Sequence, residues 1–330
     1  MTKRILLSLT LVPLLAFGCS GGRGKTSKLT IAVIPKGTTH EFWKSIHAGA
    51  IKAARDLAAP DTEIEVIWKG PLREDDREQQ IQVVEGFLSQ GVKGIVLAPL
   101  DDRALVRPVE EAARASIPTV IIDSGLQSEN IVSFVATDNY KGGELGGERL
   151  GSLLGGKGKV LLLRYQEGSA STEQREAGFL NKLKSAFPGI EVVSGDQYAG
   201  PTRETAYRAS QNVLNRFGNQ IQGVFCPNES STAGMLLALQ DINKLGKVTF
   251  VGFDASQAFI DAMQKNQLQG VVLQNPFRMG YLGVKAMIDH LRGQKVEKRI
   301  DTGVAIVTPE NLSDPKSQEL LHPPIEEYVK

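Results

Sequence analysis

The chain has 330 residues, of which 41% are hydrophobic and 23% are charged, with a formal net charge of +1 at pH 7. This composition excludes an intrinsically disordered or collagen-like chain, and the length predicts two globular domains. Because 38 basic residues balance 37 acidic ones, the chain lacks the positive charge of a protein that grips nucleic acid through its phosphates. Two cysteines in a chain of this length exclude a disulfide framework.

The first 19 residues have the pattern of an export signal. Lys3 and Arg4 precede an apolar run over residues 5–17, and the small Gly18 stands directly before Cys19. The run is shorter than the ~20 apolar residues that a helix needs to cross a bilayer. A basic start, a short apolar run and a small residue at its end predict a secretory signal peptide.

The position of Cys19 predicts lipidation. A cysteine directly after the apolar run resembles a bacterial lipoprotein signal, in which the thiol is acylated and becomes the new N-terminus. Ordinary cleavage nearby, which would leave a free thiol, is the alternative. We assign residues 1–19 to a lipoprotein signal peptide and the small, polar and basic residues 20–28 to a flexible tether. The expected location is the periplasm or the cell surface, with the membrane contacted only through the lipid anchor.

From Leu29 onward, short apolar runs alternate with segments of helical period, which predicts βαβ units and parallel sheets. The runs are continuous rather than alternating, so helices should cover both faces of each sheet. The expected elements of the first half are strand 29–35, helix 41–57, strand 63–69, helix 75–90, strand 94–99, helix 103–116, strand 118–124, strand 131–137 and the Gly-rich helix 141–154.

The second half repeats this architecture. Its expected elements are strand 159–165, helix 172–186, strand 190–196, helix 203–216, strand 223–227, helix 230–243, strand 247–254, helix 256–265, strand 268–275, helix 277–292 and a strand near 303–307. The predicted fold class is therefore α/β, with two doubly wound parallel-sheet lobes of similar size.

Sequence motifs for nucleotide binding and catalysis are incomplete or absent in this chain. The segment 141–147 has Leu145 where G-x-G-x-x-G requires its second glycine, and the segment 151–158 has Gly158 where a P-loop requires Ser or Thr. No G-x-S-x-G is present, and the four histidines lack the spacing of metal ligands. We expect no cofactor, no metal site and no catalytic residue.

Aromatic, acidic and amide side chains gather at the ends of the predicted strands, where parallel α/β sheets bind their ligands. An aromatic ring packs on the apolar face of a sugar, and carboxylates and amides bind its hydroxyls, so this mixture predicts a sugar or polyol site. Helix capping is an equal alternative for Asn228 and Asp254, and burial in a helix core is one for Phe42 and Trp43. The candidates at strand ends are Lys36, His40, Phe42, Trp43, Asp123, Ser124, Thr137, Asp138, Asn139, Arg164, Tyr165, Gln166, Asn228, Glu229, Asp254, Gln274 and Asn275.

Six ordered blocks resemble bacterial solute-binding proteins of the ribose and galactose type, the extracytoplasmic receptors of sugar ABC transporters. The resemblance implies a periplasmic binding protein type I fold, in which two lobes joined by a three-strand hinge close on a sugar. Its crossovers are expected near residues 136–139, 273–276 and 296–302. The blocks are residues 31–54, 95–124, 134–143, 175–179, 223–240, and 251–263 with 273–284.

The same resemblance implies the lobe boundaries and the ligand-binding positions. The N-terminal lobe is expected to comprise residues 29–137 and 275–297, the C-terminal lobe 138–274 and 298–312, and a polar tail 313–330. Phe42 and Trp43 match the aromatic wall, and His40 stands where the family often has Asn. The positions that match hydroxyl-binding residues are Asp123, Thr137, Asn228, Asp254 and Gln274.

Departures from the ribose receptors predict a ligand other than ribose. Ser124 and Glu173 stand where those receptors have arginines, and Tyr165 is the nearest candidate for a missing stacking partner. Lys36 and Arg164 add basic groups at other strand ends. Two interpretations stay open: a sugar acid held by these basic groups, or a neutral sugar or polyol with Lys36 in solvent.

We predict a binding protein without catalytic chemistry. It captures a sugar or polyol in an interlobe cleft and delivers it to an ABC permease, as a monomer and without a nucleic-acid partner. A periplasmic sensory subunit that presents the bound sugar to a chemoreceptor or histidine kinase is the alternative, because its sequence would look the same. A regulator of the lactose-repressor family shares the fold but needs an N-terminal helix-turn-helix, where this chain has its export signal.

Overall fold

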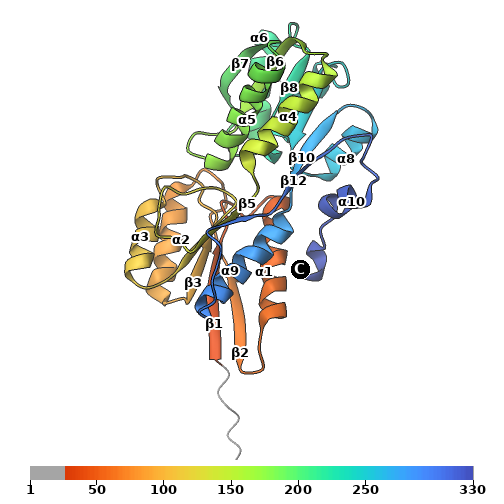
Figure 1. The fold of residues 1–330 in the computed structure, drawn as a ribbon. Coiled ribbons are helices and arrows are strands. Elements are labelled where there is room, and N and C mark those ends of the chain that lie inside the picture. The colour runs from red at the N-terminus through yellow and green to blue at the C-terminus, as the bar shows by residue number, and fades with distance from the viewer. Residues whose placement is uncertain (1–26, 330) are drawn as a thin grey trace, which may run out of the picture.

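The computed structural model describes residues 27–329, which form two α/β lobes, one above the other in Figure 1. Each lobe is built on a six-stranded sheet, in the order β11-β5-β4-β3-β1-β2 in the first lobe and β12-β10-β9-β8-β6-β7 in the second. The predicted fold class is confirmed. The signal peptide with Cys19, and the tether up to residue 26, lie outside the described residues.

The first lobe contains the N-terminal elements and two that return to it from later in the chain. Every strand pair in its described sheet is parallel. Its elements are β1 (Ser27–Ile34), α1 (Glu41–Leu57), β2 (Thr62–Trp68), α2 (Arg77–Gln90), β3 (Gly94–Leu97), α3 (Val106–Arg114), β4 (Thr119–Ile122), β5 (Ser133–Ala136), α9 (Pro276–Leu291) and β11 (Arg299–Asp301).

The second lobe has a parallel sheet with one antiparallel edge strand, β12, which pairs with β10. Its elements are α4 (Asn139–Leu153), β6 (Lys157–Arg164), α5 (Ala170–Ala186), β7 (Gly189–Tyr198), α6 (Arg203–Phe217), β8 (Gly223–Phe225), α7 (Glu229–Asp241), β9 (Thr249–Phe253), α8 (Gln257–Gln264), β10 (Gly270–Gln274), β12 (Val304–Val307), α10 (Pro315–Leu321) and the 3-10 turn η1 (Ile325–Glu327).

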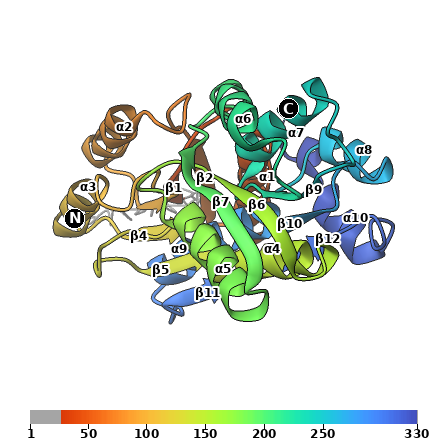
Figure 2. The ribbon, with the colours of Figure 1, turned by 90° about the horizontal axis from the view of Figure 1, so that it is seen from above.

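Helices cover both faces of each sheet, as the continuous apolar runs predicted. In the first lobe, α1 and α9 bury one face through residues such as Ile46 and Met287, and α2 and α3 bury the other through Phe87 and Val109. In the second lobe, α4 and α5 cover one face, and α6 and α7 cover the other (Figure 2). With both faces covered, the carboxyl ends of the strands are the part of each sheet left for a ligand.

The chain passes from one sheet to the other three times within the described residues, after β5, after β10 and after β11. The last passage runs through Thr302 and Gly303. Gly303 has a φ of 88°, a left-handed conformation that glycine adopts without a steric cost. The predicted assignment of residues 298–312 to the second lobe is wrong at its start, because β11 pairs with β5 in the first sheet.

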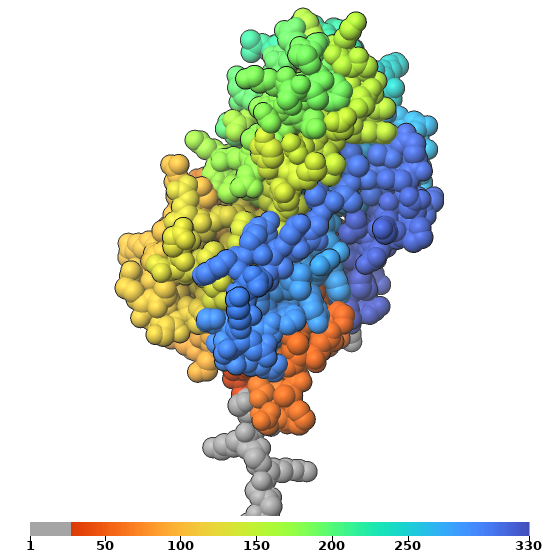
Figure 3. Space-filling view, viewed as in Figure 1, coloured from red at the N-terminus to blue at the C-terminus, as the bar shows by residue number. Residues whose placement is uncertain are grey.

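Residues 313–329, which the sequence analysis assigned to a polar tail, form a fourth connection between the lobes. Leu321 of α10 is buried in the core of the second lobe. Beyond it, η1 lies against α1 of the first lobe, and the ring of Tyr328 lies 5.7 Å from that of Phe277 in α9. The dark blue segment in Figure 3 runs along one side of the interlobe boundary.

Helices α4 and α5 approach each other closely at glycines. A Cβ atom on Gly143 would lie 1.9 Å from the carbonyl oxygen of Arg175, and one on Gly178 would lie 2.1 Å from that of Tyr140. These positions have no room for a side chain. The Gly-rich segment 141–147 therefore serves a helix contact, and this contact holds the backbone of α5 at Arg175.

We expect Gly143→Ala to lower the free energy of unfolding by about 1–3 kcal/mol, because the added methyl group forces α4 and α5 apart. Thermal unfolding monitored by circular dichroism measures the change. Gly86→Ala in α2 is the matched control, since a Cβ there meets no atom within 4 Å, and it should raise the stability by up to about 1 kcal/mol. Equal stability of the two variants would contradict the close approach.

Candidate functional site

A cavity lies between the lobes, where the carboxyl ends of strands from both sheets meet. The space between its lining side chains is about 360 Å³ when the open solvent at its mouth is included. Both lobes contribute side chains, and aromatic, acidic, basic and amide groups are all present. The lining residues are Lys36, His40, Phe42, Trp43, Glu74 and Asp123 from the first lobe, and Tyr165, Ser171, Thr172, Arg175, Asn228, Glu229, Asp254 and Gln274 from the second.

Each lobe places a buried aspartate in the left-handed backbone region directly after a central strand. Asp123 follows β4 with a φ of 63°, and Asp254 follows β9 with a φ of 66°. Few residues other than glycine adopt this conformation, although Asp and Asn tolerate it better than most. Backbone strain of this kind concentrates at binding sites. Here the two strained residues, Asp123 and Asp254, line the cavity with their carboxylates from opposite lobes.

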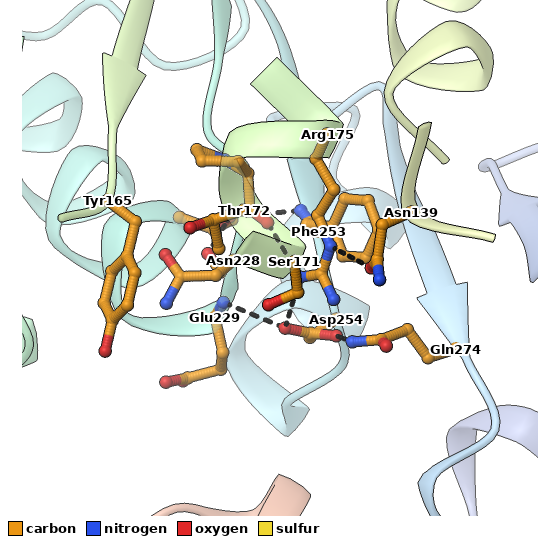
Figure 4. Close-up of polar contacts among 12 residues, drawn as sticks. Asn139, Tyr165, Ser171, Thr172, Arg175, Asn228, Glu229, Phe253, Asp254 and Gln274 are labelled. Carbon is orange, nitrogen blue, oxygen red and sulfur yellow. Dashed lines mark hydrogen bonds and ion pairs between the residues drawn. The ribbon is translucent and has the colours of Figure 1, made fainter. Parts of the chain in front are cut away.

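The second-lobe wall is a hydrogen-bonded cluster around Asp254 (Figure 4). Its Oδ1 accepts from Nε2 of Gln274 at 2.8 Å, and its Oδ2 accepts from the backbone N–H of Glu229 at 3.2 Å. Nη1 of Arg175 lies 3.9 Å from Oδ2. Burial raises the pKa of Asp254 to about 6, although the charge of Arg175 and the hydrogen bond from Gln274 oppose this rise. The charge on Asp254 therefore changes close to neutral pH.

Arg175 is held rigidly at the back of this cluster. Its Nε donates to Oδ1 of Asn139 at 2.9 Å, and its Nη1 donates to the carbonyl oxygen of Pro227 at 3.0 Å. The guanidinium also stacks on Phe253, with 3.9 Å between its carbon and the ring centroid. Burial lowers the pKa of Arg175, and the charge of Asp254 counteracts this. A guanidinium fixed in this way is a preorganised hydrogen-bond donor.

Lys36 is buried in the cavity wall, with 3% of its surface exposed. Its Nζ lies 3.0 Å from Oδ2 of Asp123 in the same lobe. It also donates to the hydroxyls of Ser169 and Ser171 in the second lobe, at 3.3 and 3.2 Å. The interpretation that placed Lys36 in solvent is therefore wrong, because its ammonium bridges the two lobes.

The aromatic side of the cavity contains three rings from both lobes. Phe42 and Trp43 meet edge to face, with 5.0 Å between their centroids, and both line the cavity although Trp43 is also part of the helix core. Tyr165 enters from the second lobe. Nε1 of Trp43 and the hydroxyl of Tyr165 donate to the same carboxylate, that of Glu74, at 2.7 and 2.5 Å. Burial, with the charge of Glu74, raises the pKa of Tyr165.

His40 faces a carboxylate from each lobe. Its Nδ1 lies 3.3 Å from Oε1 of Glu74 and 3.7 Å from Oε2 of Glu229, and Glu229 also pairs with Arg203.

Asn228 lines the cavity and at the same time caps α7 through a capping box. Capping and a place in the site, which the sequence analysis treated as alternatives, are thus compatible for Asn228.

Two buried acceptors in the cavity lining, Oε2 of Glu229 and Oε1 of Gln274, have no hydrogen-bond partner among residues 27–329. A buried acceptor without a donor costs about 1–3 kcal/mol. Both atoms can therefore receive hydrogen bonds from a bound molecule. In the same part of the chain, no group of three or more His, Cys, Asp or Glu side chains could hold a metal ion.

Thr137 and Ser124 do not line the cavity, contrary to their predicted place. The hydroxyl of Thr137 lies 3.3 Å from that of Thr302 and donates to the carbonyl of Gly303 at 3.1 Å, so it joins two of the crossovers. The hydroxyl of Ser124 accepts from the backbone N–H of Ser171 at 3.1 Å. Both residues serve the contact between lobes.

Arg164 and Glu173 also lie outside the cavity lining. Nε of Arg164 donates to Glu176 at 2.6 Å, and its guanidinium covers the ring of Tyr198. Arg164 is the last residue of β6, and Tyr165, the next residue, lines the cavity instead. Glu173 accepts from the backbone N–H of Gly168 at 2.9 Å.

Four lining residues were not predicted from the sequence: Glu74, Ser171, Thr172 and Arg175. Arg175 lies within a block that resembles the receptors, so a signal for it was available. Ser171 and Thr172 lie at the start of a helix, and Glu74 lies in the loop after an edge strand, so a search of strand ends does not find them. Glu229, which stands at a strand end beside Asn228, lines the cavity as expected.

No helix among residues 27–329 has the length and apolar character required to span a membrane.

Comparison with known proteins assigns the chain to a family. The model of the periplasmic binding protein domain matches residues 31–295. The D-allose-binding periplasmic protein of Escherichia coli (strain K12) is 31% identical over 273 residues, which cover 80% of this chain and 85% of that protein. The ribose import binding protein of Bacillus subtilis (strain 168) is 28% identical over 318 residues, covering 93% and 99%.

Solved structures agree with this family. A carbohydrate transporter solute-binding protein of Agrobacterium radiobacter, in complex with D-arabinose, has a TM-score of 0.83 and 33% identity, over 89% of this chain and 99% of that one. An ABC transporter solute-binding protein of Agrobacterium vitis with bound D-fucose has a TM-score of 0.84 and 33% identity, over 89% and 100%. Its two-lobed fold, its interlobe cavity and these similarities show that the chain belongs to the periplasmic binding protein domain family, among relatives that are sugar-binding transport proteins.

Proposed function

We propose that this protein captures a neutral monosaccharide or cyclic polyol between its lobes and delivers it to the permease of an ABC transporter, without catalysing a reaction. The observation that carries the proposal is a cavity in which both lobes present aromatic rings and hydrogen-bonding side chains to the same space. An aromatic ring covers the apolar C–H face of a sugar, and the polar groups bind its rim of hydroxyls. The sugars named for the relatives support this ligand class.

The two free acceptors of the cavity call for a ligand that donates hydrogen bonds. Oε2 of Glu229 and Oε1 of Gln274 are buried with no donor at hydrogen-bond distance among the described residues; Nδ1 of His40 lies 3.7 Å from Oε2 of Glu229. A hydroxyl satisfies such an acceptor and can itself accept from a fixed donor such as Arg175. A polyhydroxylated ring therefore complements this site better than a largely apolar molecule.

The charges of the cavity argue against the sugar acid that the sequence analysis left open. The ammonium of Lys36 is paired with Asp123, and Arg175 lies beside Asp254. Arg164 is paired outside the cavity. A ligand carboxylate would have to compete with these partners and would face the remaining acids. The acidic lining residues are Glu74, Asp123, Glu229 and Asp254, against Lys36 and Arg175 as basic ones besides His40.

A thermal-shift screen of pentoses, hexoses, 6-deoxyhexoses, cyclitols and sugar acids tests the ligand class. We expect a neutral sugar or cyclitol to raise the unfolding midpoint, because a ligand that binds only the folded state stabilises it. Ribose should not be the tightest binder, since Ser124 and Glu173, which stand where the ribose receptors have arginines, lie outside the described cavity lining and add no guanidinium to that of Arg175. A sugar acid that binds more tightly than its neutral counterpart would overturn the proposal.

Affinity for the sugar found in this way should rise with pH between about pH 5 and pH 7, by at most about tenfold per pH unit. Ionised Asp254, with its pKa of about 6, accepts a charge-assisted hydrogen bond from the ligand, and protonation leaves only a weaker neutral acceptor. Calorimetric titration at several pH values measures this. Asp254→Asn should weaken binding at neutral pH and flatten the dependence, whereas Asp261→Asn, on the exposed side of α8, should leave it unchanged. An unchanged pH profile in Asp254→Asn would show that another group causes the pH dependence of the affinity.

We also propose that the protein is exported and anchored through acylated Cys19. Metabolic labelling with a fatty-acid probe in a bacterial host should label the wild-type chain and not Cys19→Ala. Cys226→Ala is the matched control and should keep the label, because Cys226 is fully buried in the second lobe and burial raises the pKa of its thiol. Undiminished labelling of Cys19→Ala would remove the lipid anchor from the proposal.

A further inference from the structure

Glu74 occupies a central place in the cavity that neither the sequence pattern nor the family match indicates. It lies in the loop between β2 and α2 of the first lobe and is buried, with 8% of its surface exposed. Its carboxylate accepts from Trp43 in its own lobe and from Tyr165 in the other. Its backbone carbonyl oxygen also accepts from Nε2 of Gln166 in the second lobe, at 2.9 Å.

Glu74 also has contacts within its own lobe that position its side chain and its loop. A Cβ atom on Gly37 would lie 2.9 Å from Cγ of Glu74, so the glycine leaves room for this side chain. On the C-terminal side of the loop, Asp76 caps α2 by accepting from the backbone N–H of Gln79 at 2.9 Å. The bond from Trp43 to Glu74 therefore lies within one lobe, whereas the bond from Tyr165 exists only where the lobes meet.

We infer that Glu74 is a positioning residue that couples the aromatic wall of the site to closure of the lobes. Through Trp43 it sets the orientation of the indole that covers the ligand. Through Tyr165 it binds the closed form, because the phenol hydroxyl reaches the carboxylate only across the cleft. Hydrogen bonds to a buried charged group are among the strong ones, so this pair favours the closed state substantially.

Closure also has supports that do not involve Glu74. The backbone N–H of Asp102 donates to the carbonyl of Gly168 at 3.0 Å, and Arg77 donates to that of Glu167 at 3.1 Å, both across the lobes. Loss of the Tyr165 bond should therefore weaken ligand binding rather than abolish closure. The inference rests on the proposed function for its ligand-binding part only, since the bond to Trp43 is independent of any ligand.

The bond to Trp43 is tested by NMR of the indole N–H groups. The chain has two tryptophans, so two signals are expected, and Trp68→Phe assigns them. Glu74→Gln should move the Trp43 signal upfield, because an amide oxygen is a weaker acceptor than a carboxylate. Asp75→Asn, in the neighbouring position and paired with Arg73, is the control and should leave the signal in place. An unmoved signal in Glu74→Gln would overturn the inference.

The bond across the lobes is tested with Tyr165→Phe, which removes one hydroxyl and keeps the ring. D-arabinose, D-fucose and D-allose serve as probes in calorimetric titration and small-angle scattering. For a probe that binds the wild type, we expect about tenfold to a hundredfold weaker affinity and a smaller decrease in the radius of gyration at equal sugar concentration, with the Trp43 signal of the sugar-free protein unchanged. Tyr198→Phe, an exposed tyrosine of the second lobe, should match the wild type.

Wild-type affinity in Tyr165→Phe would overturn the coupling while leaving the proposed function intact. If no sugar in the panel or the wider screen binds the wild type, the proposed function fails instead. The indole signal in Glu74→Gln then decides alone whether Glu74 positions the aromatic wall.

Discussion

Burial of opposite charges between the two lobes is the constraint on which the site depends. Lys36, Asp123, Arg175 and Asp254 are all at least nine-tenths buried, and a buried charge is costly unless it is paired and hydrogen-bonded. Each lobe supplies one acid and one base of this set. Lys36 completes its hydrogen bonds only with serines of the opposite lobe, so its charge is fully paired and hydrogen-bonded only where the lobes meet.

The helix scaffold holds these groups at fixed positions. In the second lobe, the glycine contact between α4 and α5 places the backbone of Arg175 directly against α4. In the first lobe, Gly49 and Gly280 make an equivalent close contact between α1 and α9, where a Cβ on either would lie about 2 Å from a backbone oxygen. The helices that carry Trp43 and Arg175 therefore cannot slide without a backbone clash. The geometry of the proposed ligand site and the stability of each lobe therefore rest on the same contacts.

The cavity combines two kinds of contact that suit a small polyol. Phe42, Trp43 and Tyr165 supply flat apolar surface from both lobes, and the group around Asp254 supplies acceptors and a fixed guanidinium. Because the basic groups are already paired, the proposed recognition of a polyol relies on hydrogen-bond geometry rather than on net charge. Hydroxyl patterns are discriminated by such geometry, since a mismatched hydroxyl leaves a buried partner unsatisfied.

The sequence by itself determined the two-lobed fold and the main part of the site. Continuous apolar runs separated by helical segments specify covered parallel sheets, and the residues that end their strands, such as Asp123 and Asp254, necessarily lie at the shared edge. The tertiary structure alone decided which neighbours of these residues face the cavity. The hydroxyl of Thr137 contacts that of Thr302, 165 residues away, instead of the cavity. Arg164 forms an ion pair with Glu176 outside the cavity lining. Glu74 lines the cavity from a loop. The sequence does not indicate this, because its partners, Trp43 and Tyr165, come from different lobes and no local sequence pattern relates them.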